Sequence, residues 1–255
     1  MMYDIQKASV GKRISAFLFD VIVFSILAVG IAFIFSAIFG YNKTLDNLEG
    51  YYVKYSEEYG IELDISQTEY EALSEEDKAK FEAANEAIVK DEEAQRAYSL
   101  VVNVSLVILT ISLLLATLIL EFAIPLFFGN GQTLGKKIFG VALVRSASVK
   151  IKPVVLFIRS VLGKFTIETM APIMIVFMVF ISNAGLFGIV SLVLLFAFNI
   201  GALIATQNNC LIHDLLADTV AVDMATQMIF ESYEEMVDYK KKLHADAAER
   251  AKTTY

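Results

Sequence analysis

The sequence contains no tryptophan, one cysteine and two histidines among its 255 residues. The single Cys210 excludes an intramolecular disulfide. Together with His213 and His244, it also leaves too few thiol and imidazole ligands for a typical zinc site. Without tryptophan, an aromatic belt at a membrane surface would have to use tyrosine. We therefore expect no metal ion and no cofactor.

The sequence also lacks the motifs of the common enzyme classes. It has no phosphate-binding loop, dinucleotide fingerprint, nucleophile elbow or haem motif. No nucleophile can be identified in the sequence that His213 could activate as a general base. We predict that the protein has no catalytic residues, is not an enzyme and has no nucleic-acid partner.

Long apolar runs, in contrast, are abundant. Hydrophobic residues make up 56% of the sequence, and its mean hydropathy is +0.59, which is high for a soluble domain. They gather in segments close to or above the roughly 20 residues that a helix needs to cross a bilayer. These segments are residues 14–39, 100–128, 166–182 and 185–206. We predict four transmembrane helices, with Asn183, Ala184 and Gly185 forming the turn between the last two.

Charge is segregated between the connections. The connection after the second segment holds seven Lys or Arg residues and no Asp or Glu, whereas the connection after the first holds sixteen acidic and six basic residues. Because basic loops remain on the cytoplasmic side, we predict a multi-pass plasma-membrane protein with cytoplasmic N- and C-termini. The acidic connection then lies outside.

The acidic connection is predicted to be helical. Ser66 with Glu69, and Ser74 with Asp77, have the spacing of helix N-terminal caps. No Gly or Pro follows Glu75 before Pro125, so we expect one helix to run from there into the second span. This acidic surface either only covers the outer face or binds a partner or cation.

The basic connection is predicted to contain a hairpin and an interfacial helix. Residues 141–145 and 149–152 alternate around a short turn, and Pro153 suits the first turn of an amphipathic helix over 154–165. Residues 224–252 have a partial heptad pattern. They predict a cytoplasmic helix that forms a coiled coil or folds back on the protein.

The predicted fold is therefore an all-α membrane protein. It is a four-transmembrane-helix bundle with an external helical insertion, a cytoplasmic hairpin plus interfacial helix, and a C-terminal cytoplasmic helix. Its divisions are residues 1–40 (N-terminus and first transmembrane helix), 41–99 (acidic insertion), 100–128 (second transmembrane helix), 129–165 (basic loop), 166–206 (third and fourth transmembrane helices) and 207–255 (C-terminal motif and helix).

Ionisable residues inside the spans are the main functional candidates, since each costs roughly 2.5–3.5 kcal/mol to insert. At about 1.5 Å per helical residue, several of them lie at one depth, about 10 Å from the cytoplasmic boundary. We expect Arg13 to meet Glu168, Asp214 or a lipid phosphate. The predicted intramembrane polar cluster consists of Arg13, Asp20, Glu121, Glu168, Asn199 and Asp214, with His213 and Arg159 as accessory residues. Such a cluster either holds the helices in register or has a function.

Three motifs occur in order along the chain: GKRISAFLFDVIV with Arg13 and Asp20, GQTLGKKIFGVALV from Gly131, and CLIHDLLADTVAV with Asp214. In this order they resemble the RDD family of membrane proteins, which is named for one Arg and two Asp. The resemblance implies a shared membrane core, with transport among the suggested activities. The family usually has Gly where this chain has Asp218, and its external connection is often shorter.

Two functional hypotheses follow. In the first, a transporter-like or accessory membrane subunit uses the inward-facing polar cluster to handle a small cation or proton. In the second, a scaffold or assembly factor docks partners through the acidic external segment and the C-terminal helix. Besides the lipid bilayer, the expected partners are another membrane protein or a second copy of the chain.

Overall fold

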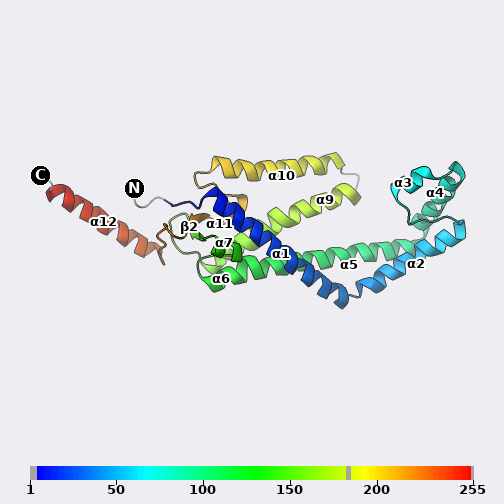
Figure 1. Ribbon diagram of the computed structural model, residues 1–255, viewed down its shortest axis with the longest axis horizontal. Coiled ribbons are helices and arrows are strands. Elements are labelled where there is room, and N and C mark those ends of the chain that lie inside the picture. The colour runs from blue at the N-terminus through cyan, green and yellow to red at the C-terminus, as the bar shows by residue number, and fades with distance from the viewer. Residues whose placement is uncertain (1–4, 182–184, 254–255) are drawn as a thin grey trace. The chain divides into compact units, whose positions relative to one another are not determined.

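The chain folds into two compact units, formed by residues 1–28 with 113–255 and by residues 29–112. The computed structural model describes residues 5–181 and 185–253. Within the described residues, four helices are long and apolar enough to cross a membrane (Figure 1): Val10–Ile38, Glu92–Phe128, Pro153–Phe180 and Gly185–Ala205. The prediction of a mostly helical protein with four such helices is confirmed. The predicted turn at Asn183 and Ala184 lies outside the described residues.

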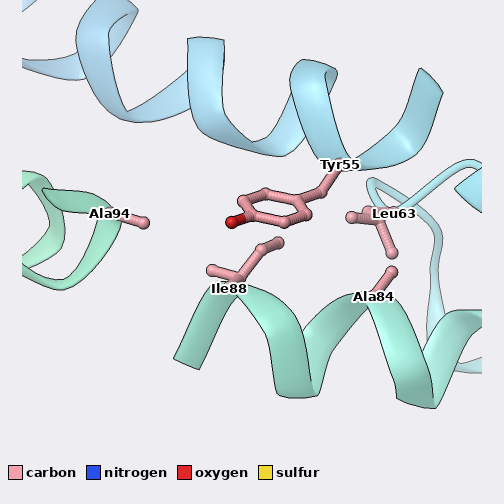
Figure 2. Close-up of a cluster of buried hydrophobic side chains, with 5 residues drawn as sticks. All are labelled: Tyr55, Leu63, Ala84, Ile88 and Ala94. Carbon is pink, nitrogen blue, oxygen red and sulfur yellow. The ribbon is translucent and has the colours of Figure 1, made fainter. Parts of the chain in front are cut away.

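The unit of residues 29–112 is a small helical assembly. Its helices include α2 (Tyr41–Tyr59), α3 (Gln67–Ala72), α4 (Glu75–Lys90) and the first part of α5 (Glu92–Thr117). A small apolar core joins α2, the loop after it, α4 and the start of α5 (Figure 2). It consists of Tyr55, Leu63, Ala84, Ile88 and Ala94. The acidic insertion therefore has a core of its own, which it forms without a disulfide.

Two predicted caps of this unit are present, but the predicted long helix is interrupted. Ser66 and Glu69 form a reciprocal capping box, and the Ser74 hydroxyl accepts a hydrogen bond from the backbone of Asp77. Asp91 has extended backbone angles and its carboxylate caps the next helix, accepting from the N–H groups at positions 93 and 94. The prediction of one continuous helix was wrong, because Asp91 stabilises a helix start more than a helix interior.

Tyr55 ties this break to α2. Its hydroxyl donates a 2.9 Å hydrogen bond to the Asp91 carboxylate. That bond raises the pKa of Tyr55 to about 12 and lowers the pKa of Asp91 below its usual range. The paired side chains hold α2 against the α4–α5 junction.

The other unit contains the start of α1 (Val10–Ile38) and the remaining elements. Along the chain these are η1 (Leu118–Ala123), α6 (Ile124–Phe128), α7 (Leu134–Ile138), β1 (Val141–Arg145), α8 (Pro153–Phe157), η2 (Ile158–Met170), α9 (Ala171–Ile181), α10 (Gly185–Ala205), α11 (Ile212–Ala217), β2 (Thr219–Asp223) and α12 (Tyr233–Thr253). The elements η1 and η2 are π-helical, with i→i+5 hydrogen bonds.

Strand β1 pairs with β2 over its whole length, whereas the predicted hairpin between β1 and residues 149–152 forms only next to its turn. The antiparallel register places Leu143 opposite Ala221. The hairpin consists of an antiparallel bridge between Val144 and Lys150 and a 2.8 Å hydrogen bond from the Arg145 N–H to the Val149 carbonyl. Both strands are buried on both faces, and their burial against Cys210 and neighbouring apolar residues accounts for the distant pairing.

The predicted interfacial helix and third span are one helical run. The segments α8, η2 and α9 follow each other without a break from Pro153 to Ile181. The basic residues in the first half of this run give it the sequence pattern of an amphipathic surface helix. In the structure part of that half is buried, including Arg159 and Ser160. The predicted boundary at residue 165 is therefore not a helix end.

The C-terminal helix begins later than predicted, at Tyr233. Before it, Phe230 forms a parallel bridge with Val149 and exchanges backbone hydrogen bonds with Ser148 and Lys150. Val149, Phe230 and Met236 then form a small buried cluster. This cluster attaches α12 to the turn that follows β1.

Candidate functional site

Asp20 connects α1 to the start of α7. Its two carboxylate oxygens accept hydrogen bonds from the backbone N–H of Gly135 at 2.7 Å and from the hydroxyl of Thr133 at 2.5 Å. Thr133 caps α7 by accepting from the backbone of Lys136. A Cβ at position 135 would lie 2.3 Å from the Ala16 carbonyl oxygen, so only glycine permits this approach.

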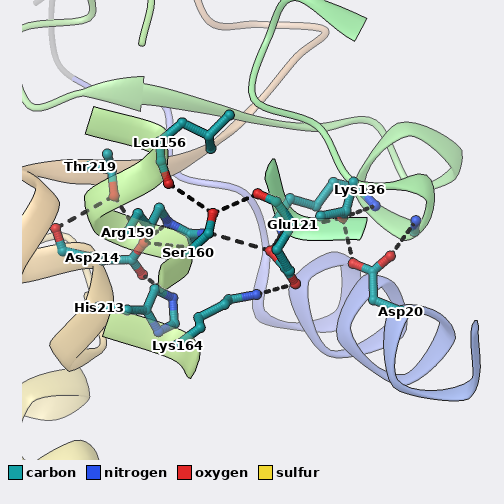
Figure 3. Close-up of polar contacts among 12 residues, drawn as sticks. Asp20, Glu121, Lys136, Leu156, Arg159, Ser160, Lys164, His213, Asp214 and Thr219 are labelled. Carbon is teal, nitrogen blue, oxygen red and sulfur yellow. Dashed lines mark hydrogen bonds and ion pairs between the residues drawn. The ribbon is translucent and has the colours of Figure 1, made fainter. Parts of the chain in front are cut away.

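Glu121 lies in the π-helical segment η1 and faces three cationic side chains (Figure 3). It forms a short ion pair with Lys164. Its Oε2 atom lies 3.9 Å from Lys136 Nζ and 3.8 Å from Arg159 Nη1. The Ser160 hydroxyl bonds the backbone carbonyl of Glu121 at 2.6 Å, which fastens η2 to η1 at this point.

Arg159 also pairs with Asp214 on α11. The Nε and Nη2 atoms of Arg159 lie 3.0 and 2.9 Å from the same Asp214 oxygen, and both residues are 2% exposed. Thr219 donates a further hydrogen bond to that carboxylate at 3.1 Å. Arg159 therefore bridges the carboxylates of η1 and α11.

His213 and Glu168 form a second pair beside this network. The Nδ1 atom of His213 lies 2.7 and 2.8 Å from the Glu168 oxygens, and its backbone N–H donates to the same carboxylate. Its Nε2 atom lies 3.4 Å from Asp214. A Cβ at Gly163 would lie 2.5 Å from the Cβ of His213, so this close packing also depends on glycine.

Burial shifts the titration of the site residues that lie outside the spans. Burial lowers the pKa of Lys136 to about 8, and the nearby Glu121 only partly opposes this effect. Burial, reinforced by Arg159, likewise lowers the pKa of His213. Burial alone would raise the pKa of Asp214, but the adjacent Arg159 guanidinium outweighs it, and that pKa lies well below its usual range. Asp214 is therefore ionised and His213 favours its neutral form.

The charged side chains of the cluster form ion pairs with one another. Among the residues that the structure describes, no three His, Cys, Asp or Glu side chains are grouped so that they could hold a metal ion. The carboxylates of the cluster are instead engaged by Lys, Arg, His, hydroxyl and backbone donors. In this arrangement neighbouring groups of opposite charge share partners.

Comparison with known proteins identifies the family. The model of the RDD family matches residues 7–218, a range that includes the charged residues of the buried network but not Thr219. The chain belongs to the RDD family. No curated protein and no solved structure matches it. The resemblance singles out Arg13, Asp20 and Asp214, and in this RDD protein each of the three contacts a different part of the chain.

Of these three, Asp20 and Asp214 have the partners described above, whereas Arg13 bonds a backbone carbonyl and not Glu168 or Asp214. Its Nη2 atom donates to the backbone carbonyl of Asn209 at 2.8 Å. Arg13 thereby ties the start of α1 to the loop between α10 and α11. Its role in this structure is to position that loop.

Asn199 stands apart from the other predicted residues. Its side-chain amide donates to the Leu195 carbonyl of its own helix at 3.3 Å. Equal depth predicted from residue counting did not ensure contact, because depth says nothing about the direction in which a helix faces. The structure brings together Glu121, Glu168 and Asp214 with the two predicted accessory residues, Arg159 and His213.

Sequence reasoning missed Lys136, Lys164 and Thr133. The two lysines were counted as charges that orient the basic loop, but both contact Glu121. Lys164 lies five residues after Arg159, a spacing that shares a face in i→i+5 turns and not in an ordinary α-helix. The one available signal was Thr133, whose capping position before Lys136 predicts a helix start there.

Proposed function

We propose that this RDD-family protein is a multi-pass plasma-membrane protein that moves a small cation or proton without catalysing a reaction. The observation that carries the proposal is Glu121, a carboxylate that is 9% exposed within an apolar span and faces three cationic side chains. Ionisable groups buried in spans generally mark ion pathways or relays. π-helical segments also occur frequently at functional sites.

The distribution of polar groups favours a site that opens toward one side of the membrane. The hydroxyls of Ser105 and Thr117 donate to carbonyls of their own helix, at 2.8 Å in each case. They are used locally and do not extend the cluster. The cluster itself uses residues of the basic connection, which the positive-inside rule assigns to the cytoplasm, together with both termini.

The shared pairing of Glu121 supports a transport role over a fixed ion pair. When Glu121 takes up a proton or a cation, its attraction for Lys164, Lys136 and Arg159 weakens. Arg159 then retains Asp214 as its partner, and Lys136 retains its 3.2 Å hydrogen bond to Thr133. These remaining contacts would hold Arg159 and Lys136 in place in the loaded state, so that loading of Glu121 could be reversible.

Reconstitution into liposomes tests this proposal. We expect the wild-type protein to carry a proton or monovalent-cation flux under an imposed gradient, and Glu121→Gln to reduce that flux at least tenfold. Asn199→Leu is the matched control, because Asn199 is a polar residue of a span that bonds only its own helix in the contacts given above. Absence of flux in the folded wild type, or equal flux in wild type and Glu121→Gln, would refute the transport role.

A scaffold or assembly role is the second candidate, favoured by the separate apolar core of the acidic unit. An autonomous core allows an insertion to present a fixed surface to a partner. Crosslinking in native membranes, with photoreactive groups in α3 or α12, would then recover one defined membrane-protein partner. Recovery of only the uncrosslinked chain would count against this role.

A further inference from the structure

Two buried polar atoms in the cluster lack a hydrogen-bond partner among the described residues. They are Glu121 Oε2 and Arg159 Nη1. The side chains of these residues are 12% and 3% exposed. Buried groups of this kind are rarely left unsatisfied, since they have lost their bonds to solvent. Both atoms belong to the unit of residues 1–28 with 113–255.

The two atoms are close neighbours. They lie 3.8 Å apart, which is too long for a direct hydrogen bond. Lys136 Nζ approaches Glu121 Oε2 to 3.9 Å, again beyond hydrogen-bond distance. Lys136 uses one of its three N–H donors on Thr133. The region is therefore bordered by one carboxylate acceptor and two cationic donors.

We propose that Glu121 Oε2, Arg159 Nη1 and Lys136 Nζ together form a binding site for a single buried water molecule. A water oxygen accepts two hydrogen bonds, and these come from Arg159 and Lys136. The same water donates one hydrogen bond to Glu121. Buried waters typically have about three such partners, so the three atoms form a complete site.

The charges around the site favour water over an ion. A halide would be attracted by Arg159 and Lys136, but it would face the Glu121 carboxylate without a proton to donate. While Glu121 is paired with Lys136, Arg159 and Lys164, as it is in this structure, these three cationic side chains would repel a metal cation from the site. Water is neutral and is both donor and acceptor. It is the small ligand that satisfies all three atoms at once.

The water site rests on these buried atoms and does not depend on the proposed transport activity. It adds a ligand to the network, because the water links the pairing of η1 and η2 with the start of α7. Flux could be absent while the water is present, and the reverse. The crystallographic test of the water site and the flux test of the transport role can therefore fail independently of each other.

Crystals of the full-length protein grown in a lipid phase, at a resolution that shows ordered solvent, provide the test. We expect one spherical peak within about 2.7–3.2 Å of all three atoms. Anomalous data from crystals soaked in bromide and in rubidium should show no peak at that position. An anomalous peak would overturn the proposal in favour of an ion. Direct contact between Glu121 and Arg159 without density between them would also overturn it.

A variant tests whether Glu121 holds the water. Glu121→Met keeps the length of the side chain but removes the acceptor, and we expect the peak to disappear. The peak should remain in Asn199→Leu, which removes a polar group outside the network. An unchanged peak in Glu121→Met would overturn the assignment of Glu121 as a ligand. If that variant does not fold, the wild-type bromide and rubidium data decide the question by themselves.

Discussion

Arg159 donates to a single oxygen of Asp214 from two of its nitrogens, at 3.0 Å from Nε and 2.9 Å from Nη2. Both residues are almost fully buried. The pair joins η2 to α11, two segments far apart in the sequence. Removing Asp214 leaves the buried Arg159 with only the Glu121 carboxylate, at 3.8 Å, as an anionic partner, and breaking one side of a buried pair is costlier than replacing both members.

Asp214→Asn should therefore destabilise the protein by about 3–5 kcal/mol, the typical result of breaking one side of a buried pair. The double variant Arg159→Met with Asp214→Leu should be more stable than either corresponding single variant, because it leaves no unpaired charge between these positions. Reversible unfolding in mixed detergent micelles measures the difference. If Asp214→Asn is as stable as wild type, the pair does not hold these helices together.

Gly163→Ala should destabilise the protein by about 1–3 kcal/mol through overpacking. The added Cβ would lie 2.5 Å from the Cβ of His213, so the helices must separate. Gly201→Ala is the control: nothing lies within 4 Å of its added Cβ, and alanine favours helix by up to about 1 kcal/mol. Thermal unfolding of both variants measures the contrast, and equal melting temperatures would contradict the close packing.

Because the pKa of Lys136 is lowered, we expect the free energy of unfolding to rise with pH in the alkaline range. Burial lowers its pKa from 10.5 to about 8, so between these values the unfolded chain binds more protons than the folded one. Folding is penalised fully below pH 8, and the penalty disappears as pH approaches 10.5. The gain is up to about 3 kcal/mol at 1.36 kcal/mol per pKa unit.

The measurement is the difference in unfolding free energy between wild type and Lys136→Met across pH 7 to 10, which cancels the titration of other groups. The exposed Lys242→Met variant serves as the control for loss of a lysine. A difference that does not change with pH for Lys136→Met would show that Lys136 keeps an ordinary titration.

Asp218 stands where the resemblance to the RDD family implies a glycine, and its backbone conformation accounts for why both residues suit this position. Its backbone is left-handed, with φ 50° and ψ 53°, and it ends α11. Asp tolerates this conformation better than most residues, and its carboxylate lies 2.7 Å from Arg145 Nη2. Asp218→Gly should change stability by less than about 1 kcal/mol, because relief of strain offsets the loss of a half-exposed ion pair.

Asp218→Val, in contrast, should cost at least about 1–2 kcal/mol, since a β-branched residue is strained in the left-handed region. The same unfolding assay compares the two variants. Equal stabilities of the glycine and valine variants would show that the backbone at this position does not require a positive φ.

Sequence alone determined the features that depend on local composition. Apolar runs of spanning length predicted the four membrane helices, because a bilayer imposes one length on any helix that crosses it. Local hydrogen bonding predicted the caps at Ser66 and Ser74. Charge identified candidates within the spans, such as Asp20 and Glu121, since ionisable groups are rare there.

Only the tertiary structure decided which partners those residues have. Strand β1 pairs with β2, more than 70 residues away by number, because shared burial and not chain proximity selects the partner. Likewise, the i→i+5 turns of η2 carry Arg159 and Lys164 to Glu121, while Asn199 bonds only within its own helix among the contacts given above. Hydropathy sets the depth of a side chain, but the direction in which it points depends on how the helices wind and pack.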